Sequence, residues 1–547
     1  MLFNSSIFLF AFLPLTLVGF FVLARHVGVF AAKVWLCFAS FVFYGWWYPA
    51  FLLLLTGSIV FNYVLSLLLK DEESIRQRVL LTAGVAANLL LLFYYKYLFQ
   101  LMQFMYGWNW ISTKVDLVVL PLGISFFTFT QVGYLVDCRQ GLVRERGLLN
   151  YILFVTFFPH LIAGPILHHR EIMPQFASDA TYRFKAENLA TGLTLFAVGM
   201  FKKVVFADAI APWAEAGFAH VAGIQAVHAW SVVLAYAMQL YFDFSGYSDM
   251  AIALGIMFGV RLPLNFNSPY KSRSVVDYWQ RFHMTLTRYL TLLLYNPMSL
   301  WVARRRAAKG QVVGRQAAST LGGFTSMIVF PTMTTMLLAG IWHGAGLQFL
   351  IFGLLHGAYM SVNHGWRVFF PVSSKPPLLQ RSMVRRLWST VWPVVATFLA
   401  VVVAQIFFRA TGTRDAFAML GGMVGVNGSG LPLPIAPRNP ANMGAVQQWL
   451  VHCHVLISST AQAYGTVTLP LVHNALLIVL LAIVAFGAPN IYQIMDRYSP
   501  ALAKDHSGLH TILLWRPTWL WALASGGMLF WATLRFDHPA RFLYFQF

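Results

Sequence analysis

The chain has few charged residues, fewer acidic than basic ones, and almost no cysteine. Asp, Glu, Lys and Arg make up 10% of its 547 residues, whereas soluble domains carry about 25%. This scarcity excludes an ordinary soluble enzyme. The three cysteines, Cys37, Cys138 and Cys453, provide neither a disulfide framework nor a CxxC metal site. We interpret them as small buried apolar side chains.

Several sequence motifs are also missing. The chain has no Walker sequence and no GxGxxG, GxSxG or HExxH motif in a fitting context. ATP-driven transport, metalloprotease and serine hydrolase activities therefore lose their usual support. We expect no metal and no bound cofactor. The first apolar stretch, residues 7–23, lacks a basic segment before it and a small-x-small site after it, so it is not a cleavable signal.

What the chain has in abundance is apolar sequence. Hydrophobic residues make up 59% of it, and apolar stretches of about 20 residues recur. Backbone amides find no water inside lipid, so such stretches must be helices. We expect an all-α polytopic membrane protein of roughly eleven to fourteen helices, in a single integral membrane domain over residues 1–547. The clearest stretches are residues 7–23, 52–69, 79–98, 394–408 and 471–486.

The distribution of basic residues predicts the topology. There are 38 Lys and Arg against 18 Asp and Glu, a net charge of +20. The basic residues lie in short loops and at helix ends, as the positive-inside bias requires, and we therefore reject nucleic acid as a partner. Basic residues mark the loops around 25–33, 70–78 and 139–146 as cytosolic. We expect a bacterial inner membrane protein, embedded in the lipid bilayer, with its N-terminus outside the cytosol.

Three segments interrupt the plain pattern of helix and loop. Residues 154–175 are broken by Pro159 and by Gly164-Pro165, with basic residues on both sides, which predicts a segment that enters from the cytosol and returns. Residues 265–315 are rich in Lys and Arg and predict a cytosolic or semi-embedded basic platform. Residues 412–468 contain many Gly, Pro and Asn and predict an irregular loop.

The most compact polar group in an apolar setting is Gly340-Ile341-Trp342-His343-Gly344. Ionisable groups at membrane depth are functional candidates, and imidazole is the usual general base that removes a hydroxyl proton during acyl transfer. We expect the flanking glycines to leave room for a substrate. The alternative is a core histidine that is hydrogen-bonded to a carbonyl.

A second group, Tyr278 to Arg288, contains one histidine and two arginines. On one helix, His283 and Thr287 would share a face, and Arg281 and Arg288 would lie one heptad apart. We interpret the arginines as candidates for binding an anionic donor and His283 as a second imidazole of the site. A solvated amphipathic helix is the alternative.

A third group lies in an apolar helix that we expect around residues 239–249. Carboxylates in such a helix need ionic partners or a wet cavity, and we expect Arg281 or Arg273 as the partners. Structural ion pairing and substrate contact both remain open. The supporting candidates are Asp243, Ser245, Tyr247 and Asp249.

Eight ordered segments, from about residue 120 to the end, resemble the membrane-bound O-acyltransferase family. They include PLGISFFTF, FFPHLIAGPI, FKKVVFAD, YFDFSGYSDMAIALG, NFNSPY, YWQRFHMTL, GIWHGAGLQFLIFGLLHG and the tail FLYFQF. The similarity is to the bacterial envelope-polymer branch, which includes membrane subunits for alginate and peptidoglycan O-acetylation and the teichoic acid D-alanyltransferase. The sequence departs from the family pattern at Gln280, Phe282 and His160, which leaves the donor and the polymer open.

The resemblance implies a ring of helices, some of them re-entrant, around a thinned centre with a tunnel. It also implies that His343 is the catalytic histidine and His283 the second site histidine, with Trp342 beside them. An acyl-CoA donor, most simply acetyl-CoA, would dock near the basic platform. The acyl group would pass to a separate extracytoplasmic transferase and then to an exported polysaccharide such as alginate, or to peptidoglycan.

The tail, residues 541–547, has two interpretations. Aromatic residues often anchor a chain at the membrane interface. In the related D-alanylation machinery a similar F-x-Y-x-x-F tail occurs on a partner protein, and this resemblance implies that Tyr544 is an acyl relay. Two alternatives to the whole hypothesis remain: a non-catalytic transporter or scramblase, and a lipid or protein acyltransferase with a long-chain donor.

Overall fold

The computed structural model describes residues 1–107, 110–112, 119–370, 383–430, 464–502, 514–536 and 543. Within these ranges the chain is helical and contains no β-strand, only an isolated antiparallel bridge between Phe266 and Phe282. The prediction of an all-α protein is confirmed.

The helices fall into three groups along the chain. The first group is α1 (Leu13–His26), α2 (Val29–Gly45), α3 (Phe51–Leu68), α4 (Ile75–Phe93), α5 (Phe99–Gly107), α6 (Ile124–Arg139), α7 (Leu148–Thr156), α8 (Phe158–Leu161) and α9 (His169–Ala177). The second is α10 (Ala186–Phe201), α11 (Asp208–Ala219), α12 (Ala226–Met257), α13 (Val275–Trp279), α14 (Met284–Leu290), α15 (Asn296–Ala308), α16 (Arg315–Ala318) and α17 (Leu321–Phe324). The third is α18 (Phe330–His343), α19 (Leu347–Phe369), α20 (Met383–Arg409), α21 (Thr413–Met423), α23 (Tyr464–Gly487), α24 (Ile491–Ile494) and α25 (Trp519–Thr533).

Short π-helical segments interrupt several of these helices. Two of them carry buried lysines: η2 (Tyr94–Leu98) holds Lys96, and η4 (Lys202–Ala207) holds Lys203. A π-helical turn shifts the register of the side chains that follow it and often occurs at functional sites. The other π-helical segments are η1 (Phe8–Phe12), η6 (Thr291–Tyr295) and η7 (Thr325–Val329).

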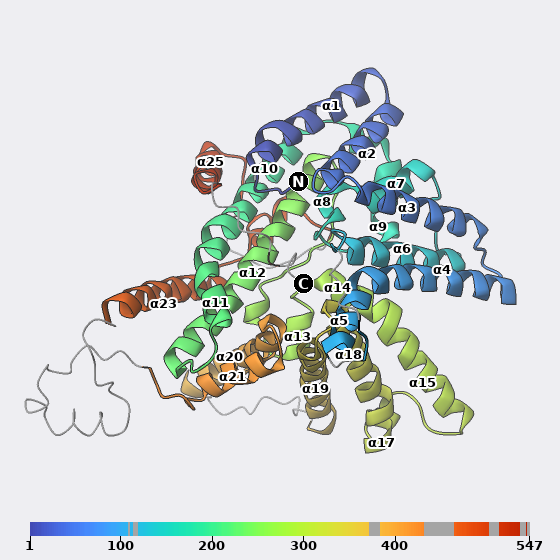
Figure 1. Ribbon diagram of the computed structural model, residues 1–547. Helices are drawn as coiled ribbons and strands as arrows, with labels where there is room; N and C mark the ends of the chain where they lie inside the picture. Colours follow the sequence, from blue (N-terminus) through green and yellow to red (C-terminus); the bar gives the residue numbers. More distant parts are fainter. Residues whose placement is uncertain are drawn as a thin grey trace, which may run out of the picture.

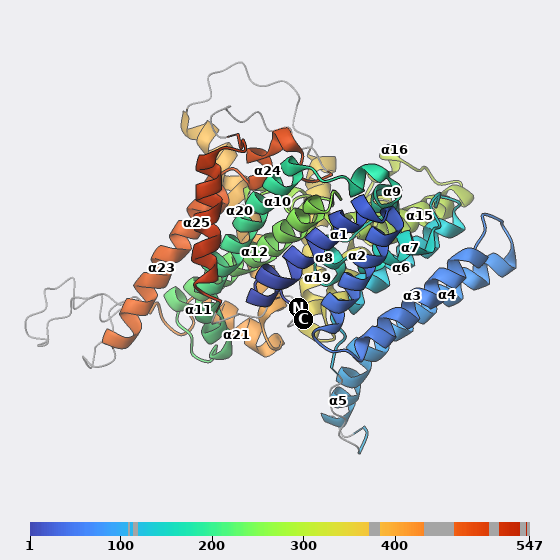
Figure 2. The same ribbon diagram turned by 90° about the horizontal axis from the view of Figure 1, so that it is seen from above.

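The longest helix forms the axis of the molecule. α12 has 32 residues, most of them buried, and it runs through the middle of the helices with α10 and α11 packed along it (Figure 1). α3 and α4 extend side by side to one side of this axis, and α23 and α25 lie on the opposite side (Figure 2). The helices α18 and α19 pack on each other as a pair.

Five described helical stretches are long and apolar enough to cross a membrane: Phe8–His26, Phe51–Leu68, Ile75–Gln103, Leu321–His343 and Trp388–Arg409. Two shorter apolar helices, Val29–Gly45 and Leu471–Gly487, accompany them. The apolar stretches identified from sequence are therefore helical, as expected. The total of eleven to fourteen helices in the bilayer, the inner membrane location and the orientation of the N-terminus stay predictions.

The broken segment 154–175 returns to its starting side of α6. It is divided among α7, α8 and α9, the longest of which has nine residues, too few to span a bilayer. Its tip reaches the start of α6, since a Cβ on Gly123 would lie 2.7 Å from the Leu161 carbonyl oxygen. Its end returns to the other end of α6, where His169 is hydrogen-bonded to Asp137. These contacts support the re-entrant interpretation.

The other two interrupted segments differ from expectation. Residues 265–315 divide into a buried part, which includes α13 and α14, and an exposed part around α15. The expected irregular loop over 412–468 begins with the helix α21, which packs on α12 through buried Ala416 and Met419. Residues 464–468 belong to α23. The burial of one apolar face explains why a Gly-rich sequence is helical here.

Candidate functional site

His343 lies between two cavities. It is the last residue of α18 and is buried, with 6% of its surface exposed. On one side it lines a cavity of about 2210 Å³, and on the other a small one of about 40 Å³ that it shares with His283. The rings of Trp342, Phe352 and Phe408 surround its imidazole at centroid distances of 4.7 to 5.8 Å. A histidine that only filled the core would not face a space of this size.

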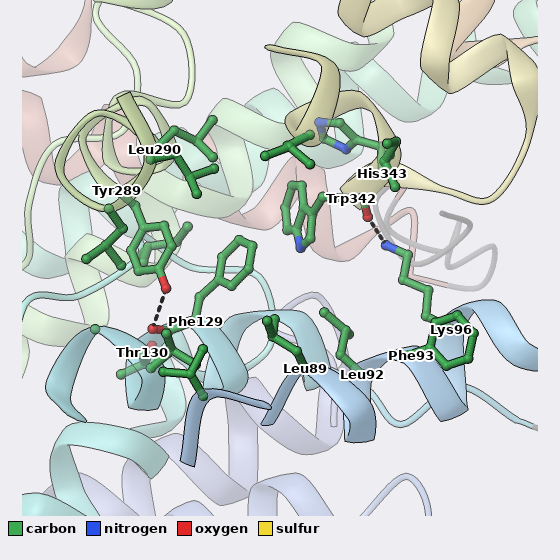
Figure 3. A pocket seen from close by; sticks show the side chains of 18 of the residues that line it. Leu89, Leu92, Phe93, Lys96, Phe129, Thr130, Tyr289, Leu290, Trp342 and His343 are labelled. Carbon is green, nitrogen blue, oxygen red and sulfur yellow. Dashed lines mark hydrogen bonds between the residues drawn. The ribbon is translucent and has the colours of Figure 1, made fainter. Parts of the chain in front are cut away.

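The large cavity extends from the end of α6 to the end of α18. Leucines and aromatic residues from α4, α6 and η6 form most of its wall, with Leu89, Leu92 and Phe129 among them (Figure 3). Phe129 stacks on the Trp342 ring at 5.2 Å. At the α6 end the lining becomes polar, with Asp137, His168, His169, Arg170 and Arg288.

Lys96 holds the end of α18. Its Nζ donates a hydrogen bond to the Trp342 carbonyl oxygen at 2.6 Å, as Figure 3 shows, and lies 5.4 Å from the centre of the Trp342 ring. Tyr97 donates to the same carbonyl at 3.2 Å. Carbonyls at a helix C-terminus have no intrahelical partner and carry negative partial charge. The buried Nζ of Lys96 donates the hydrogen bond that this carbonyl lacks within its helix, and it so fixes the residue next to His343.

The sequence predicted that the glycines around His343 leave room for a substrate, but they instead bring helices together. A Cβ on Gly340 would lie 2.3 Å from the Phe349 carbonyl oxygen, and one on Gly344 would lie 2.3 Å from the Phe349 ring. Gly353 meets Met336 of α18 just as closely. The space beside His343 therefore comes from the large cavity.

His283 breaks the helix that the sequence predicted over 278–288. It has a left-handed backbone with φ of 49°, between α13 and α14. Its Nδ1 lies 3.0 Å from Asn265 Oδ1, and the Thr285 hydroxyl donates to the same amide oxygen at 2.9 Å. The buried Asn265 thus fixes a turn that periodicity could not reveal, and it directs the His283 ring toward the small cavity.

A third histidine shares this cavity. His356 of α19 is 1% exposed, and its Nδ1 accepts a hydrogen bond from the Trp279 indole at 3.2 Å. Together with His283 and His343 it lines the space of about 40 Å³. His356 lies in the motif GIWHGAGLQFLIFGLLHG but was not predicted as a site residue.

The two candidate arginines do not lie together. Arg281 pairs with Asp277 at 2.7 Å and lines neither cavity. Arg288 lines the large cavity and pairs with Glu171 of α9 at 2.6 Å. The broken helix separates them, so only Arg288 is placed to meet a molecule in the large cavity.

The carboxylates of α12 are paired with lysines, not with the expected arginines. Asp243 pairs with Lys203 at 2.8 Å, and Asp249 pairs with Lys202 at 2.7 Å. Asp208 also accepts from Lys203, at 2.6 Å. Both lysines come from η4, which packs along α12. The remaining candidates of this helix, Ser245 and Tyr247, are buried, and none of the four lines either cavity.

The C-terminal segment reaches these carboxylates. Leu543 is 3% exposed, and its backbone N–H donates to Asp243 Oδ2 at 2.9 Å. Leu543 itself therefore lies inside the protein, and both interpretations of the tail stay predictions. The candidate relay Tyr544 itself lies outside the described residues.

Four residues of the site, Lys96, Asp137, His168 and His169, were not predicted from the sequence. Lys96 is the single cation in the apolar run 79–98, and the rule that ionisable groups at membrane depth are functional candidates would have identified it. Nothing in the sequence showed that Asp137 meets the two histidines, because 30 residues separate Asp137 from His168.

Comparison with known proteins gives consistent results. The model of the MBOAT family, the membrane-bound O-acyltransferases, matches residues 85–398. The chain is 39% identical to the peptidoglycan O-acetyltransferase of Helicobacter pylori, over 79% of this chain and 81% of that one. It is 36% identical to a probable alginate O-acetylase AlgI of Pseudomonas aeruginosa, over 77% and 74% of the two chains.

A more distant relative extends the same picture. The teichoic acid D-alanyltransferase of Bacillus subtilis is 28% identical over 51% of this chain and 65% of its own length. The matched family region contains α18 with His343, the broken helix with His283, and both cavities' main walls. The chain belongs to the membrane-bound O-acyltransferase family.

Proposed function

We propose that this protein transfers an acetyl group from a cytosolic thioester, acetyl-CoA in the simplest case, to a hydroxyl group on the way to an envelope glycan. The proposal depends most on one observation: His343 stands at the boundary between a cavity large enough for an acyl donor and a small, mainly apolar cavity that His283 and His356 also line. Ligand pockets of about 300–1,000 Å³ already hold drug-sized molecules, so the large cavity has room for a thioester arm.

The large cavity is polar at one end and apolar toward His343, and this difference indicates the end at which the donor enters. Its polar end lies at the C-terminal end of α6, beside the loop 139–146 that the positive-inside bias assigns to the cytosol. Its apolar part leads from there to His343. A donor would therefore enter with its charged part at Arg288 and Arg170 and its acyl group pointing toward His343.

The chemistry requires one proton acceptor and one acceptor hydroxyl. In this proposal His343 removes the hydroxyl proton as the oxygen attacks the thioester carbonyl. The carbon–sulfur bond then breaks, and the thiolate takes up the proton and leaves toward the cytosol. His283 and His356 lie on the far side of His343 and provide polar contacts for the developing oxyanion or the acceptor. General bases of this type contribute about 10²–10⁴-fold in rate.

The relatives support a proposal for the acceptor. The two most informative are named for peptidoglycan and for alginate, so we infer a glycan outside the cytosol, reached through a separate extracytoplasmic transferase. Peptidoglycan and alginate are the two acceptors to test first.

Membrane vesicles with the cytosolic face exposed, supplied with acetyl-CoA that is labelled on the acetyl group, test this proposal. Wild-type protein should give labelled ester on the glycan, and His343→Ala should give at least 100-fold less at equal membrane abundance. Ester formation at the wild-type rate by His343→Ala would remove the catalytic assignment. Labelled acetyl-CoA that crosses the membrane without any ester product would favour the transporter.

A series of thioesters with longer acyl chains separates the remaining alternative. An acetyl-transferring enzyme should lose rate as the chain grows, whereas a long-chain lipid or protein acyltransferase should gain rate.

A further inference from the structure

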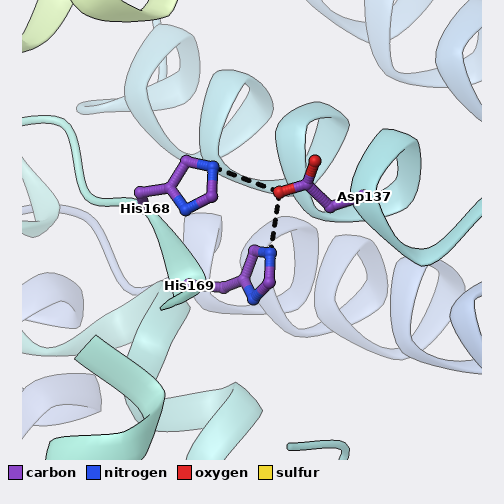
Figure 4. A group of neighbouring side chains, drawn as sticks. All are labelled: Asp137, His168 and His169. Carbon is purple, nitrogen blue, oxygen red and sulfur yellow. Dashed lines mark hydrogen bonds and ion pairs between the residues drawn. The ribbon is translucent and has the colours of Figure 1, made fainter. Parts of the chain in front are cut away.

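Three side chains converge at the polar end of the large cavity, away from His343. They are Asp137 near the end of α6, His168 just before α9, and His169 as the first residue of α9. Figure 4 shows both imidazole rings directed at one carboxylate oxygen: the His169 Nε2 lies 2.7 Å and the His168 Nε2 3.1 Å from Asp137 Oδ2. One potential ligand atom from each residue lies within 4.8 Å of the others.

We propose that Asp137, His168 and His169 form a binding site for a divalent transition metal ion, best fitted by Zn²⁺. Two imidazole nitrogens and one carboxylate oxygen are a common protein contribution to a tetrahedral zinc site, and the fourth position is then open to water or to another ligand. The three side chains line the large cavity, so this fourth position faces it.

The backbone explains how two adjacent histidines reach the same point. His168 is extended, with φ of −108° and ψ of 130°, and His169 begins a helix. The two rings are therefore roughly parallel, with centroids 4.9 Å apart and planes inclined by 29°. Consecutive residues of one helix would point their side chains about 100° apart, so the break before α9 is what allows both to bind one ion.

One nearby charge opposes the ion. Arg170 Nε lies 3.9 Å from Asp137 Oδ2, with its side chain 46% exposed. This exposure lets the guanidinium turn toward water when the ion binds. His168 Nδ1 accepts a weak hydrogen bond from the Arg170 backbone N–H at 3.4 Å, and binding through Nε2 requires that Nδ1 carry the proton instead. The ion therefore replaces the two imidazole–carboxylate hydrogen bonds, together with these two weak contacts, by three metal–ligand bonds.

The ion would strengthen a connection between two elements that the imidazole–carboxylate hydrogen bonds already join. Asp137 belongs to α6 and the histidines to the returning end of the re-entrant segment. A bound ion would fix that segment at the mouth of the large cavity. This inference does not depend on the reaction proposed above.

The test uses full-length protein in detergent, purified through a tag without histidine. After incubation with Zn²⁺ and removal of free ion, elemental analysis should give about one Zn²⁺ per chain for the wild type. The double variant His168→Gln, His169→Gln should retain less than a tenth of that amount, and His26→Gln, a change at an exposed histidine, should retain all of it. The same analysis reports Fe and Mn, and one equivalent of either would correct the identity of the metal but not the site.

Two further measurements keep the result unambiguous if the double variant folds poorly. His168→Gln changes the more exposed ligand, at 29% against 5% for His169, and should lower Zn²⁺ affinity at least tenfold. Co²⁺ bound to the wild type should give visible d–d absorption bands of tetrahedral intensity. The proposal would be overturned if the wild type bound clearly less than one ion per chain. It would also be overturned if the double variant and His168→Gln bound as much metal as the wild type.

Discussion

Two regions of this molecule bury ionisable groups, and they differ in what surrounds those groups. Around α12 and η4, Asp243, Asp208 and Asp249 each have a lysine partner within 2.8 Å and face neither cavity. At the end of α18, Lys96 and His343 face a cavity of about 2210 Å³. The ion pairs of α12 and η4 neutralise charge inside the fold. The side chains at the end of α18 instead present polar groups to the large cavity.

Access to a cavity therefore distinguishes residues that can act in catalysis from residues that only stabilise the fold better than burial does. An ionisable side chain in an apolar setting made Asp243, Asp249 and His343 candidates alike, because a buried charge is expensive wherever it lies. A closed ion-pair network gives a substrate no access, whereas a histidine at a cavity wall can exchange a proton with a bound molecule. Changes in the α12–η4 region should therefore reduce the amount of folded protein, and changes at the cavity should reduce turnover at normal abundance.

The largest effect that tests this comparison concerns Tyr544. The preceding residue, Leu543, is held in the paired region through Asp243, yet a relay would have to act at the cavity. The phenol is more easily deprotonated than an alkyl alcohol, with a pKa near 10. Tyr544→Phe keeps the ring and removes only the oxygen. If the tyrosine carries the acyl group, glycan acylation should fall to background while membrane abundance stays normal.

Mass spectrometry of the C-terminal peptide provides the second half of that test. Wild-type protein given labelled acetyl-CoA should carry the label on Tyr544, and the His343→Ala variant should not. Normal glycan acylation by Tyr544→Phe would assign the tail to structure alone.

The next largest effect is a loss of folded protein when Lys203 is replaced. Lys203 is 3% exposed and pairs with both Asp208 and Asp243, so Lys203→Met leaves two carboxylates without their cation. Breaking a buried pair in this way costs about 3–5 kcal/mol. Membrane abundance and the thermal midpoint in detergent should both fall sharply. Lys185→Met, at an exposed position, is the matched control and should change neither. A stable Lys203→Met protein with reduced turnover would contradict the division between the two regions.

The sequence alone predicted much of this picture, and the limits of the prediction are physical. Apolar runs such as 52–69 and 79–98 are helical because lipid leaves the backbone no other partner, and that rule needs no tertiary information. His343 was identified because its neighbours were apolar. The partners of Asp243 and Asp249 could not be identified, because a π-helical segment sets the register of Lys202 and Lys203. The turn at His283 depends on a contact with Asn265, 18 residues away.

A smaller effect is expected at Lys96, which we assign as a positioning residue. A hydrogen bond from a charged group is worth about 1.5–3 kcal/mol, and about 1.4 kcal/mol corresponds to a factor of ten in rate. Lys96→Met should therefore lower kcat roughly tenfold or more and change the donor KM less. The Trp342 carbonyl keeps Tyr97 as a donor, so the protein should still fold.

Two further variants show whether this effect is one of position. Lys96→Arg should restore part of the lost kcat, because it keeps a cation near the end of α18. Tyr97→Phe removes the second donor to the same carbonyl but keeps the lysine, and it should lower kcat less than Lys96→Met. A loss of abundance without a change in kcat would place Lys96 with the structural charges of α12.

The smallest effects are expected for Arg281 and Arg288, the two arginines that sequence periodicity put on one face. Arg288 lines the large cavity, whereas Arg281 faces neither cavity and is paired with Asp277. If anionic donor groups reach the polar end of the cavity, Arg288→Gln should raise the donor KM several-fold and leave kcat nearly unchanged, since it removes binding that is equal in ground state and transition state. Arg281→Gln should change both constants less than twofold, because an exposed ion pair contributes about 0–1 kcal/mol. Steady-state rates at varied acetyl-CoA concentration measure both variants. A larger KM effect at Arg281 than at Arg288 would mean that the donor binds outside the large cavity, and the cavity would lose its role as the path to His343.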